Sequence, residues 1–545
     1  MTSSEIPSCA TLTRRSLLAA MPASAMLMAG TAMPRIAFAQ EAEVPEALAE
    51  NVAAAPVEPQ KFSFDILTEE MRQLATQPYA APTIPSSFLE KLTYDDYRMI
   101  RFNPERARWA SADKSFYQLH AFHMGWLFKE PVLIYEIEGE TAALMGFDTD
   151  DFIYEREVGE RVPPHAQLPG VAGFRLHYPL NRPDVFDELV AFVGASYFRA
   201  LGRGSAYGLS ARGLALNTGL AKAEEFPRFS RFYVERPQPG SETITFYATL
   251  ESPSVTGAYR FVMTPGFETV MDVTARLNFR ADVEQLGIAP LTSMFLFGER
   301  NRTDFDDFRP NVHDSDGLQI TRHDGDMLWR PLANPPRLSS SYFAETNPKS
   351  FGLHQRDREF DHYQDAAAHY EKRPSVSVEP IGDWGPGAVR LVEIPSDLEV
   401  NDNIVAFWVP EAPAKAGETR EYAYRLLWGD LPPNTHDDLA HILETRIGHG
   451  GVSGVENKDG SRKFVIDFKG GLLGNLPGGS DVKAIVNVTG GEIVTQILEQ
   501  IWGTDVWRLV VDVVPSEKDT VELNAHIAGF DRKLSETWLY QWIKR

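Results

Sequence analysis

The chain has 545 residues, a formal net charge of −23 at pH 7 and a single cysteine, Cys9. So acidic a surface repels nucleic-acid phosphates and anionic lipid headgroups, which excludes nucleic acid as a partner and leaves a neutral polymer compatible with the charge. The lone cysteine excludes disulfides, thiolate metal sites and a thiol nucleophile. No apolar run after the N-terminal region reaches about 18 residues, so no membrane span is expected.

The N-terminus has the features of an export signal. Thr13-Arg14-Arg15-Ser16-Leu17-Leu18 is a twin-arginine pattern, an apolar run follows it, and Ala37-Phe38-Ala39 fits a cleavage site. We therefore predict a targeting segment over residues 1–39 and a periplasmic location. Residues 40–60 are rich in Ala, Glu and Pro and are predicted to form a flexible linker.

The next segments in chain order predict two helices and then many strands. Helical spacing of apolar residues favours helices at Phe62–Leu74 and Ser86–Ile100. From Gln118 onward, short β-branched or alternating runs are separated by Gly, Pro, Asn and Asp, which is typical of a large antiparallel β-sandwich. The clearest strands are Pro131–Ile137, Thr243–Leu250, Ala258–Met263 and Thr269–Leu277, and one further helix is expected near Asp361–Lys372.

A Pro/Ala/Gly stretch after Trp408 indicates a domain boundary. We therefore expect a large β-sandwich over residues 61–408 and a smaller one over residues 409–545. The density of short strands in the second part fits an immunoglobulin-like sandwich without the cysteine pair. The expected strands there are Tyr422–Trp428, Phe464–Phe468, Val482–Thr489, Val506–Val514 and Thr520–Ala528.

Several kinds of catalytic site lack their sequence motifs. There is no H-E-x-x-H and no G-x-S-x-G, and the glycine-rich segments follow no βαβ pattern. We therefore predict no metal ion and no cofactor.

Carboxylates and aromatic residues are concentrated between Gly287 and Trp408. Paired carboxylates are what glycoside cleavage needs, one as acid and one as base or nucleophile, and aromatic faces pack against sugar rings. An ordinary structural role, as turn caps or ion-pair partners, remains open for each acid, and an ordinary core role for each aromatic. The candidate acids are Asp314, Asp316, Asp357, Glu399 and Asp402, and the aromatic candidates are Trp329, Trp384, Trp408, Tyr363 and Tyr370.

Long motifs across the chain resemble the periplasmic, osmoregulated glucan biosynthesis proteins G and D. The segments that carry the resemblance include Gly194–Ala200, Tyr207–Ala215, Gly287–Phe295, His313–Asp316, Trp329–Leu332, Asp402–Val405 and Ser535–Tyr540. The twin-arginine signal is more typical of the D type. The resemblance implies a galactose-mutarotase-like N-terminal β-sandwich with a cleft, a C-terminal immunoglobulin-like sandwich, and a role in making glucans with a β-1,2-linked backbone.

The resemblance also implies roles for individual residues. Asp402 matches a proposed general acid, Asp314 the base side, and Glu399 a third acid of the cleft. Tyr370 and Arg373 match sugar-contacting positions. Trp329 and Trp384 are predicted, from their place in the sequence beside these acids, to bind substrate. The chain departs from the family pattern at Asn311 and Ser377, and its Gly450–Lys463 region is short beside the D-type loop.

Two functions remain open from the sequence. The first is an inverting glycoside hydrolase or transglycosylase acting on β-1,2-glucan. The second is a non-catalytic glucan-binding or assembly factor that works with a membrane glucan synthase. The sequence leaves a homodimer open as well.

Overall fold

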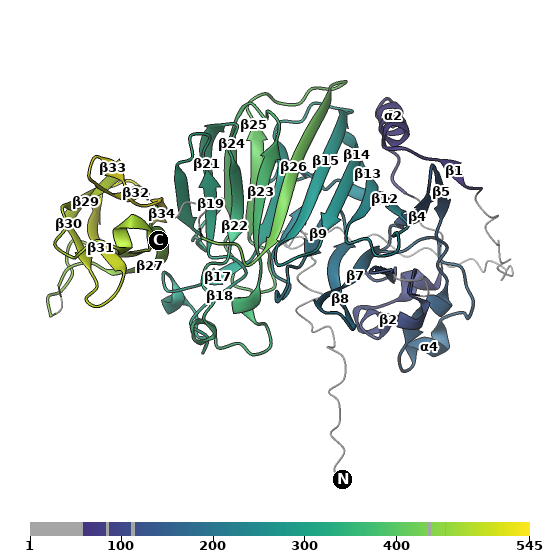
Figure 1. Ribbon diagram of the computed structural model, residues 1–545, viewed down its shortest axis with the longest axis horizontal. Helices are drawn as coiled ribbons and strands as arrows, with labels where there is room; N and C mark the ends of the chain where they lie inside the picture. The colour runs from purple at the N-terminus through teal and green to yellow at the C-terminus, as the bar shows by residue number, and fades with distance from the viewer. Residues whose placement is uncertain (1–57, 83–86, 111–114, 434–437, 453, 545) are drawn as a thin grey trace, which may run out of the picture.

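A computed structural model describes residues 58–82, 87–110, 115–433, 438–452 and 454–544. The predicted targeting segment and most of the predicted linker lie outside these ranges. Figure 1 shows a large β-sandwich followed by a smaller β-sandwich that carries the C-terminus. Among the described residues, no helix has the length and apolar character needed to cross a bilayer.

The first sheet extends through both units. In spatial order it contains β1 (Gln60–Lys61), β5 (Thr141–Leu144), β4 (Leu133–Glu138), β12 (Arg228–Glu235), β13 (Ile244–Glu251), β14 (Val255–Thr264), β15 (Thr269–Phe279), β26 (Thr419–Gly429), β23 (Ser375–Ile381), β22 (Ser350–His354), β19 (Gly317–Thr321), β20 (Met327–Pro331), β34 (Thr537–Ile543), β32 (Thr520–Gly529) and β29 (Val482–Thr489). The short strand β33 (Arg532–Lys533) pairs with β32.

A second sheet packs against the first sheet in the large unit, and the two share one core. Its order is β21 (Ser339–Thr346), β24 (Pro386–Glu393), β25 (Ile404–Pro410), β16 (Leu286–Ser293), β10 (Ser210–Arg212), β9 (Tyr197–Ala200), β8 (Val185–Val193), β7 (Gly173–Arg182) and β3 (Gln118–Phe122), with β11 (Ala215–Leu216) also on β16. Two small ladders join β17 (Phe295–Phe297) to β18 (Val312–His313) and β2 (Ile100–Phe102) to β6 (Phe152–Tyr154).

Aromatic residues pack the two sheets of the large unit together. Strand β15 alternates buried and partly exposed side chains over most of its length, as expected for a strand with one face on a core. Phe174 of β7 lies edge-to-face on Phe232 of β12 at 4.8 Å, and Phe192 of β8 contacts Phe246 of β13 at 5.5 Å. The mostly-β prediction is confirmed.

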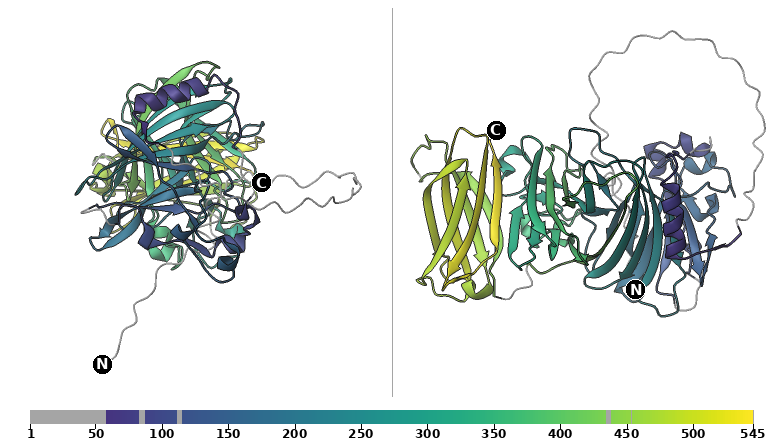
Figure 2. Two further views of the ribbon diagram at one scale, coloured as in Figure 1. Left: turned by 90° about the vertical axis from the view of Figure 1, so that its right-hand side faces the viewer. Right: turned by 90° about the horizontal axis from the view of Figure 1, so that it is seen from above.

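The C-terminal unit adds its own four-stranded sheet to the end of the first sheet. This sheet has the order β27 (His441–His449), β28 (Arg462–Lys469), β31 (Val506–Pro515) and β30 (Gly491–Gln500). It packs on β29, β32 and β34 around a core that includes Phe464 and Trp538. Viewed from above, the unit lies end to end with the large sandwich (Figure 2).

The predicted boundary after Trp408 needs correction. β26, which follows that position, lies between β15 and β23 in the large sheet. The expected strand Tyr422–Trp428 therefore belongs to the large sandwich, because its alternating residues complete that core. The other strands predicted for the C-terminal unit form there as β28, β29, β31 and β32.

Helices are few and mostly short. α2 (Phe64–Leu74) confirms the first predicted helix and lies against β14, where Thr256 donates to the backbone oxygen of Met71. The second prediction is wrong within residues 87–100, which form η2 (Phe88–Lys91), α3 (Tyr94–Tyr97) and the start of β2. The remaining short helices are η3 (Pro104–Arg106), η4 (Thr149–Asp151), α4 (Val158–Arg161), η5 (Arg302–Asp304), η6 (Phe360–His362), η7 (Tyr370–Lys372) and α5 (Gly471–Gly474).

The helix expected at Asp361–Lys372 is also wrong, because only the single turns η6 and η7 form there. His369 adopts a left-handed backbone conformation with φ of 47° between them, which a continuous helix does not allow. This irregular segment carries two of the predicted site residues.

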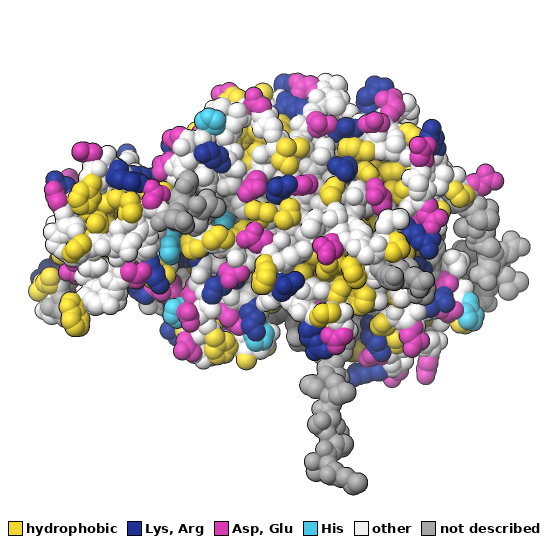
Figure 3. Space-filling view, viewed as in Figure 1, with side chains coloured by type: hydrophobic (Ala, Val, Ile, Leu, Met, Phe, Trp, Pro, Cys, Tyr) yellow, Lys and Arg dark blue, Asp and Glu magenta, His cyan; other side chains and the backbone are white. Residues whose placement is uncertain are grey.

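The surface agrees with the acidic composition. Asp and Glu side chains are spread over the face shown in Figure 3, with Lys and Arg side chains between them. On this face, basic side chains therefore lie next to acidic ones instead of forming a separate basic patch.

Candidate functional site

Three chain segments bring the predicted acids together. Asp314 directly follows β18, and Asp402 lies two residues before β25. The side chain of Asn403 joins these strands: its Oδ1 accepts from the amide of Phe295 at 2.8 Å, and its Nδ2 donates to the carbonyl of the same residue at 3.0 Å. Because Phe295 pairs with His313 across the β17–β18 ladder, this amide clamp places Asp402 near Asp314.

Asp402 is a buried carboxyl group with weak compensation. It forms an ion pair with Arg199, whose Nη2 lies 3.8 Å from Oδ2. Burial raises the pKa of Asp402 from 3.8 to about 7; the nearby charge of Asp314 raises it further, while Arg199, Arg212 and Arg373 oppose the rise. Asp402 therefore keeps its proton near neutral pH.

Asp314 has a direct ion pair instead. It is 2% exposed, and the Nη1 of Arg373 donates to its Oδ1. Burial raises the pKa of Asp314, while Arg373 and Arg199 oppose the rise. The direct guanidinium contact of Asp314 favours its ionised form more strongly than the 3.8 Å contact with Arg199 favours that of Asp402.

The position of Arg373 depends on a glycine. A side-chain carbon added at Gly208 would lie 2.9 Å from the Cβ of Arg373, so a larger residue would displace the arginine. The same loop is joined to η7 by a hydrogen bond from the amide of Ala206 to the carbonyl of Lys372 at 2.8 Å. The loop that contains Ala206 and Gly208 thus fixes the position of Arg373 in its ion pair with Asp314.

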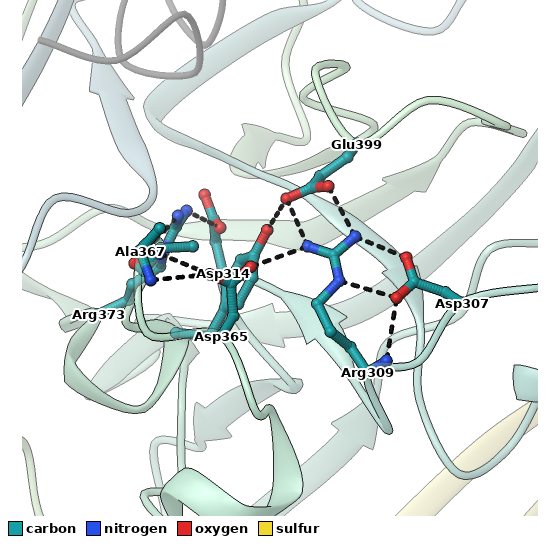
Figure 4. Close-up of polar contacts among 9 residues, drawn as sticks. Asp307, Arg309, Asp314, Asp365, Ala367, Arg373 and Glu399 are labelled. Carbon is teal, nitrogen blue, oxygen red and sulfur yellow. Dashed lines mark hydrogen bonds and ion pairs between the residues drawn. The ribbon is translucent and has the colours of Figure 1, made fainter.

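Glu399 belongs to a network centred on Arg309, as Figure 4 shows. Arg309 donates to both oxygens of Glu399, at 3.2 and 3.0 Å, and also binds Asp307 at 2.6 Å and Asp365 at 3.0 Å. The hydroxyl of Tyr370 donates to Glu399 as well. Glu399 therefore accepts hydrogen bonds from two side chains, and the guanidinium of Arg309 favours its ionised form.

Tyr370 lies inside this network. The residue is fully buried, and the Arg373 guanidinium lies 4.2 Å from the centre of its ring. One side chain therefore contacts both Glu399 and the arginine that pairs with Asp314. The structure brings five of the seven predicted site residues together: Asp314, Tyr370, Arg373, Glu399 and Asp402.

The predictions for Trp329 and Trp384 need correction, because both rings are buried in cores. The Arg356 guanidinium covers the Trp329 ring at 3.6 Å, and Trp329 packs into the C-terminal core. Trp384 precedes β24, whose register pairs Gly387 with Pro410 and Glu393 with Ile404. Six residues of strand, about 20 Å, therefore separate the Trp384 end of β24 from the Asp402 end.

Asp316 and Asp357 have structural roles, as the sequence analysis left open. Asp316 accepts from the backbone amides of Arg356 and Asp357 at 2.9 and 3.0 Å. Asp357 accepts from His362 at 2.9 Å, and not from Arg356 or Arg358. Both acids stabilise the turn after β22.

The sequence analysis assigned no role to Arg199, Arg309 or Asp365. Arg199 lies within the motif Gly194–Ala200, which was a signal for its importance, and its Nε donates to Ser210 at 2.7 Å. Arg309 and Asp365 had no signal, because nothing in their local sequence predicts a contact across 56 positions. Within the described ranges, no group of three or more His, Cys, Asp or Glu side chains could hold a metal ion.

Comparison with known proteins identifies the family. The model of the family described as "Periplasmic glucan biosynthesis protein, MdoG" matches residues 62–542. The chain belongs to this family. Membership places it among periplasmic proteins of glucan biosynthesis.

Curated relatives carry both G and D names. The chain is 63% identical to "Glucans biosynthesis protein G" of Cereibacter sphaeroides over 535 residues, which cover 98% of each chain. It is 44% identical to "Probable glucans biosynthesis protein D" of Shewanella oneidensis over 504 residues, 91% of each chain. The relatives therefore do not separate the G type from the D type that the signal pattern favoured.

A solved galactose mutarotase related enzyme from Lactobacillus acidophilus is a much more distant match. It has a TM-score of 0.20 and 10% identity, and the match covers 44% of this chain and 96% of that one.

Proposed function

We propose that this protein acts on the β-1,2-linked backbone of a periplasmic glucan, as an inverting glycoside hydrolase or transglycosylase. The observation that carries the proposal is a pair of buried acids of which only Asp314 has a direct guanidinium partner, so that Asp402 would keep the proton and Asp314 would carry the charge. Glycoside cleavage with inversion requires that division of protonation states between two carboxyl groups.

Asp402 would act as general acid. A pKa of about 7 leaves the carboxyl mostly protonated at pH 6 and still able to release the proton. In the reaction, Asp402 would donate its proton to the glycosidic oxygen as the bond from that oxygen to the anomeric carbon breaks.

Asp314 would act on the base side. It would accept a proton from a water molecule, or from a sugar hydroxyl in transfer, as that oxygen bonds to the anomeric carbon. The proton gained by Asp314 balances the proton lost by Asp402, so hydrolysis consumes one water per bond. Glu399, Arg309 and Tyr370 would position η7 and Arg373 beside this pair.

The test is incubation of the purified protein with linear β-1,2-glucan at pH 6, with chromatography of the products and NMR of the new reducing ends. We expect shorter chains whose new ends are initially the α-anomer. Asp402→Asn should lower the rate by about 10²–10⁴-fold, the usual contribution of a general acid. No cleavage by the unmodified protein across pH 5–8 would overturn the proposal.

A matched control separates chemistry from folding. Asp467 is a buried carboxylate on β28 of the C-terminal unit, where it pairs with Arg446 and Arg508. Asp467→Asn should keep the glucan-cleaving rate, while Asp402→Asn should keep glucan binding. Tight glucan binding without turnover in the unmodified protein would instead favour the assembly factor that works with a membrane glucan synthase.

A further inference from the structure

A cavity of about 390 Å³ lies between the two units, separate from the carboxylate cluster. The large unit contributes Arg300 and the segment Ala333–Pro336 to its lining, and the C-terminal unit contributes Arg462 and the segment Tyr540–Lys544. None of Asp314, Glu399 and Asp402 lines it. The volume is within the range of sites for small ligands.

Two arginines that line this cavity have buried donor atoms without an acceptor. The Nε and Nη2 of Arg300 and the Nε of Arg462 are buried and have no hydrogen-bond partner among the residues that the structure describes. Buried donors are nearly always paired in folded proteins, because leaving one unpaired costs about 1–3 kcal/mol. Both residues line the cavity, one from each unit, so an acceptor bound in it would meet both side chains.

The buried carboxylate that lines this cavity, Glu393, already accepts hydrogen bonds from other groups. Glu393 accepts from Arg330 at 3.0 Å and from the amide of Ala333 at 2.7 Å. Asp304 also lines the cavity, but its side chain is on the exposed rim. On the opposite rim, Lys544 adds a cation whose Nζ donates to the carbonyl of Ser516 at 2.6 Å.

The pKa of Tyr540 is influenced by more positive than negative charges. Its ring lies 5.3 Å from the Arg330 guanidinium, and the charges of Arg300, Arg330 and Arg462 all act to lower its pKa, although burial outweighs them. Glu393 is the single acid that opposes them among the main influences on Tyr540. The cavity is therefore suited to an anion.

We propose that this cavity binds the oxyanion group of a small solute, a phosphate or a carboxylate, between Arg300 and Arg462. Guanidinium groups bind both oxyanions through paired N–H donors. Tyr540 supplies a hydroxyl at the same wall. Because the two arginines belong to different units, the bound anion bridges the interface between them.

The experiment is calorimetric titration of the purified protein with inorganic phosphate and, separately, with acetate, at constant ionic strength maintained by sodium chloride. We expect saturable binding of at least one of the two anions with one site per chain. Binding of phosphate alone assigns a phosphate site, and binding of acetate alone assigns a carboxylate site. If the heat changes do not saturate with either anion, the cavity takes up an adventitious ion only, and the proposal is overturned.

Variants locate the site. Arg300→Gln and Arg462→Gln should each weaken binding at least tenfold, since each removes charge and a donor fork. Arg182→Gln, which alters an exposed arginine paired with Asp184, should bind as the unmodified protein does. Equal binding by all three variants would overturn the proposal.

Thermal unfolding gives a second, independent readout. In the absence of anion, Arg300→Gln should unfold at the same or a higher temperature than the unmodified protein, because two buried donor atoms without acceptors have been removed. Added phosphate or acetate should raise the unfolding temperature of the unmodified protein only. A variant that is strongly destabilised without anion would show that Arg300 is satisfied within the protein, and would overturn the proposal.

Discussion

The carboxylate cluster and the junction between the two units use the same residue types differently. At the junction, Arg356 donates to both oxygens of Glu536 at 2.9 Å, and the two side chains are almost fully buried. In the cluster, Asp402 is also buried, but its ion pair with Arg199 is longer, at 3.8 Å. The Arg356–Glu536 pair therefore has balanced charge, whereas the cluster retains an acid that keeps its proton.

This difference separates stability from chemistry. A buried pair with good hydrogen bonds holds two surfaces in one geometry, and removing one partner leaves a costly charge. A buried acid without a close partner stores an unfavourable ionisation, which is useful for proton transfer and unfavourable for stability. The following predictions test whether the two regions differ in this way.

The largest effect is expected at the junction. Glu536→Ala should lower the free energy of unfolding by about 3–5 kcal/mol, because Arg356 would remain buried without its carboxylate partner. Chemical denaturation measures the change. Asp430→Ala is the control, since Asp430 is 77% exposed in its pair with Arg358 and its loss should cost less than about 1 kcal/mol.

The next effect is a gain of stability in the cluster. A pKa raised from 3.8 to about 7 means that the folded state loses stability as pH rises through this window. Asp402→Asn removes the ionisation, so the variant should exceed the unmodified protein by roughly 2–4 kcal/mol at pH 8 and should show little advantage at pH 4. A variant that is less stable than the unmodified protein at both pH values would contradict the assignment.

The pH dependence of activity provides a third test. Because Asp402 must be protonated to act, the glucan-cleaving rate should fall about tenfold per pH unit above an apparent pKa near 7. Arg199→Gln removes a cation that opposes the raised pKa, so it should move this limb towards higher pH. If the pH at which the rate begins to fall is the same in Arg199→Gln and the unmodified protein, a group other than Asp402 controls the fall.

The smallest effect is expected at Tyr370. Tyr370→Phe removes the hydroxyl that donates to Glu399 and should lower kcat by roughly 3–10-fold at a cost of about 1 kcal/mol in stability. Tyr363→Phe is a matched control, because Tyr363 is equally buried and stacks on Tyr370 but donates to the carbonyl of Asp357 instead. Its stability should fall by a similar amount while kcat is unchanged.

Sequence patterns predicted the architecture well where strands alternate. The period of two in β13, β14 and β15 marks their buried faces directly. The same patterns could not place β26, because a Pro/Ala/Gly turn before it resembles a domain linker while its partner strands lie far away in the sequence. The short turns at η6 and η7 depend on tertiary contacts, so helical spacing overestimated them.

Sequence reasoning chose acids that lie together in the structure, but it chose the aromatic residues of the candidate site less well. Asp314 and Asp402 lie in long motifs, Glu399 was found by its match to a third acid of the family's cleft, and the structure brings the three acids close together. Trp329 and Trp384 were chosen because they lie near those acids in the sequence, but strand register carries Trp384 to the other end of β24 and Arg356 covers Trp329. The role of Arg309 was missed, because only the folded chain brings three acids to it.

The parallel contact between β20 and β34 has a consequence for how the chain folds during synthesis. Leu328 and Trp329 pair with Thr537 and Trp538, about 200 residues later and almost at the end of the chain. At about 5–20 residues per second, a ribosome needs roughly 10–40 s to deliver the partner strand. During that interval the edge of β20 is open to other chains, which leaves the nascent polypeptide exposed to aggregation until β34 has been synthesised.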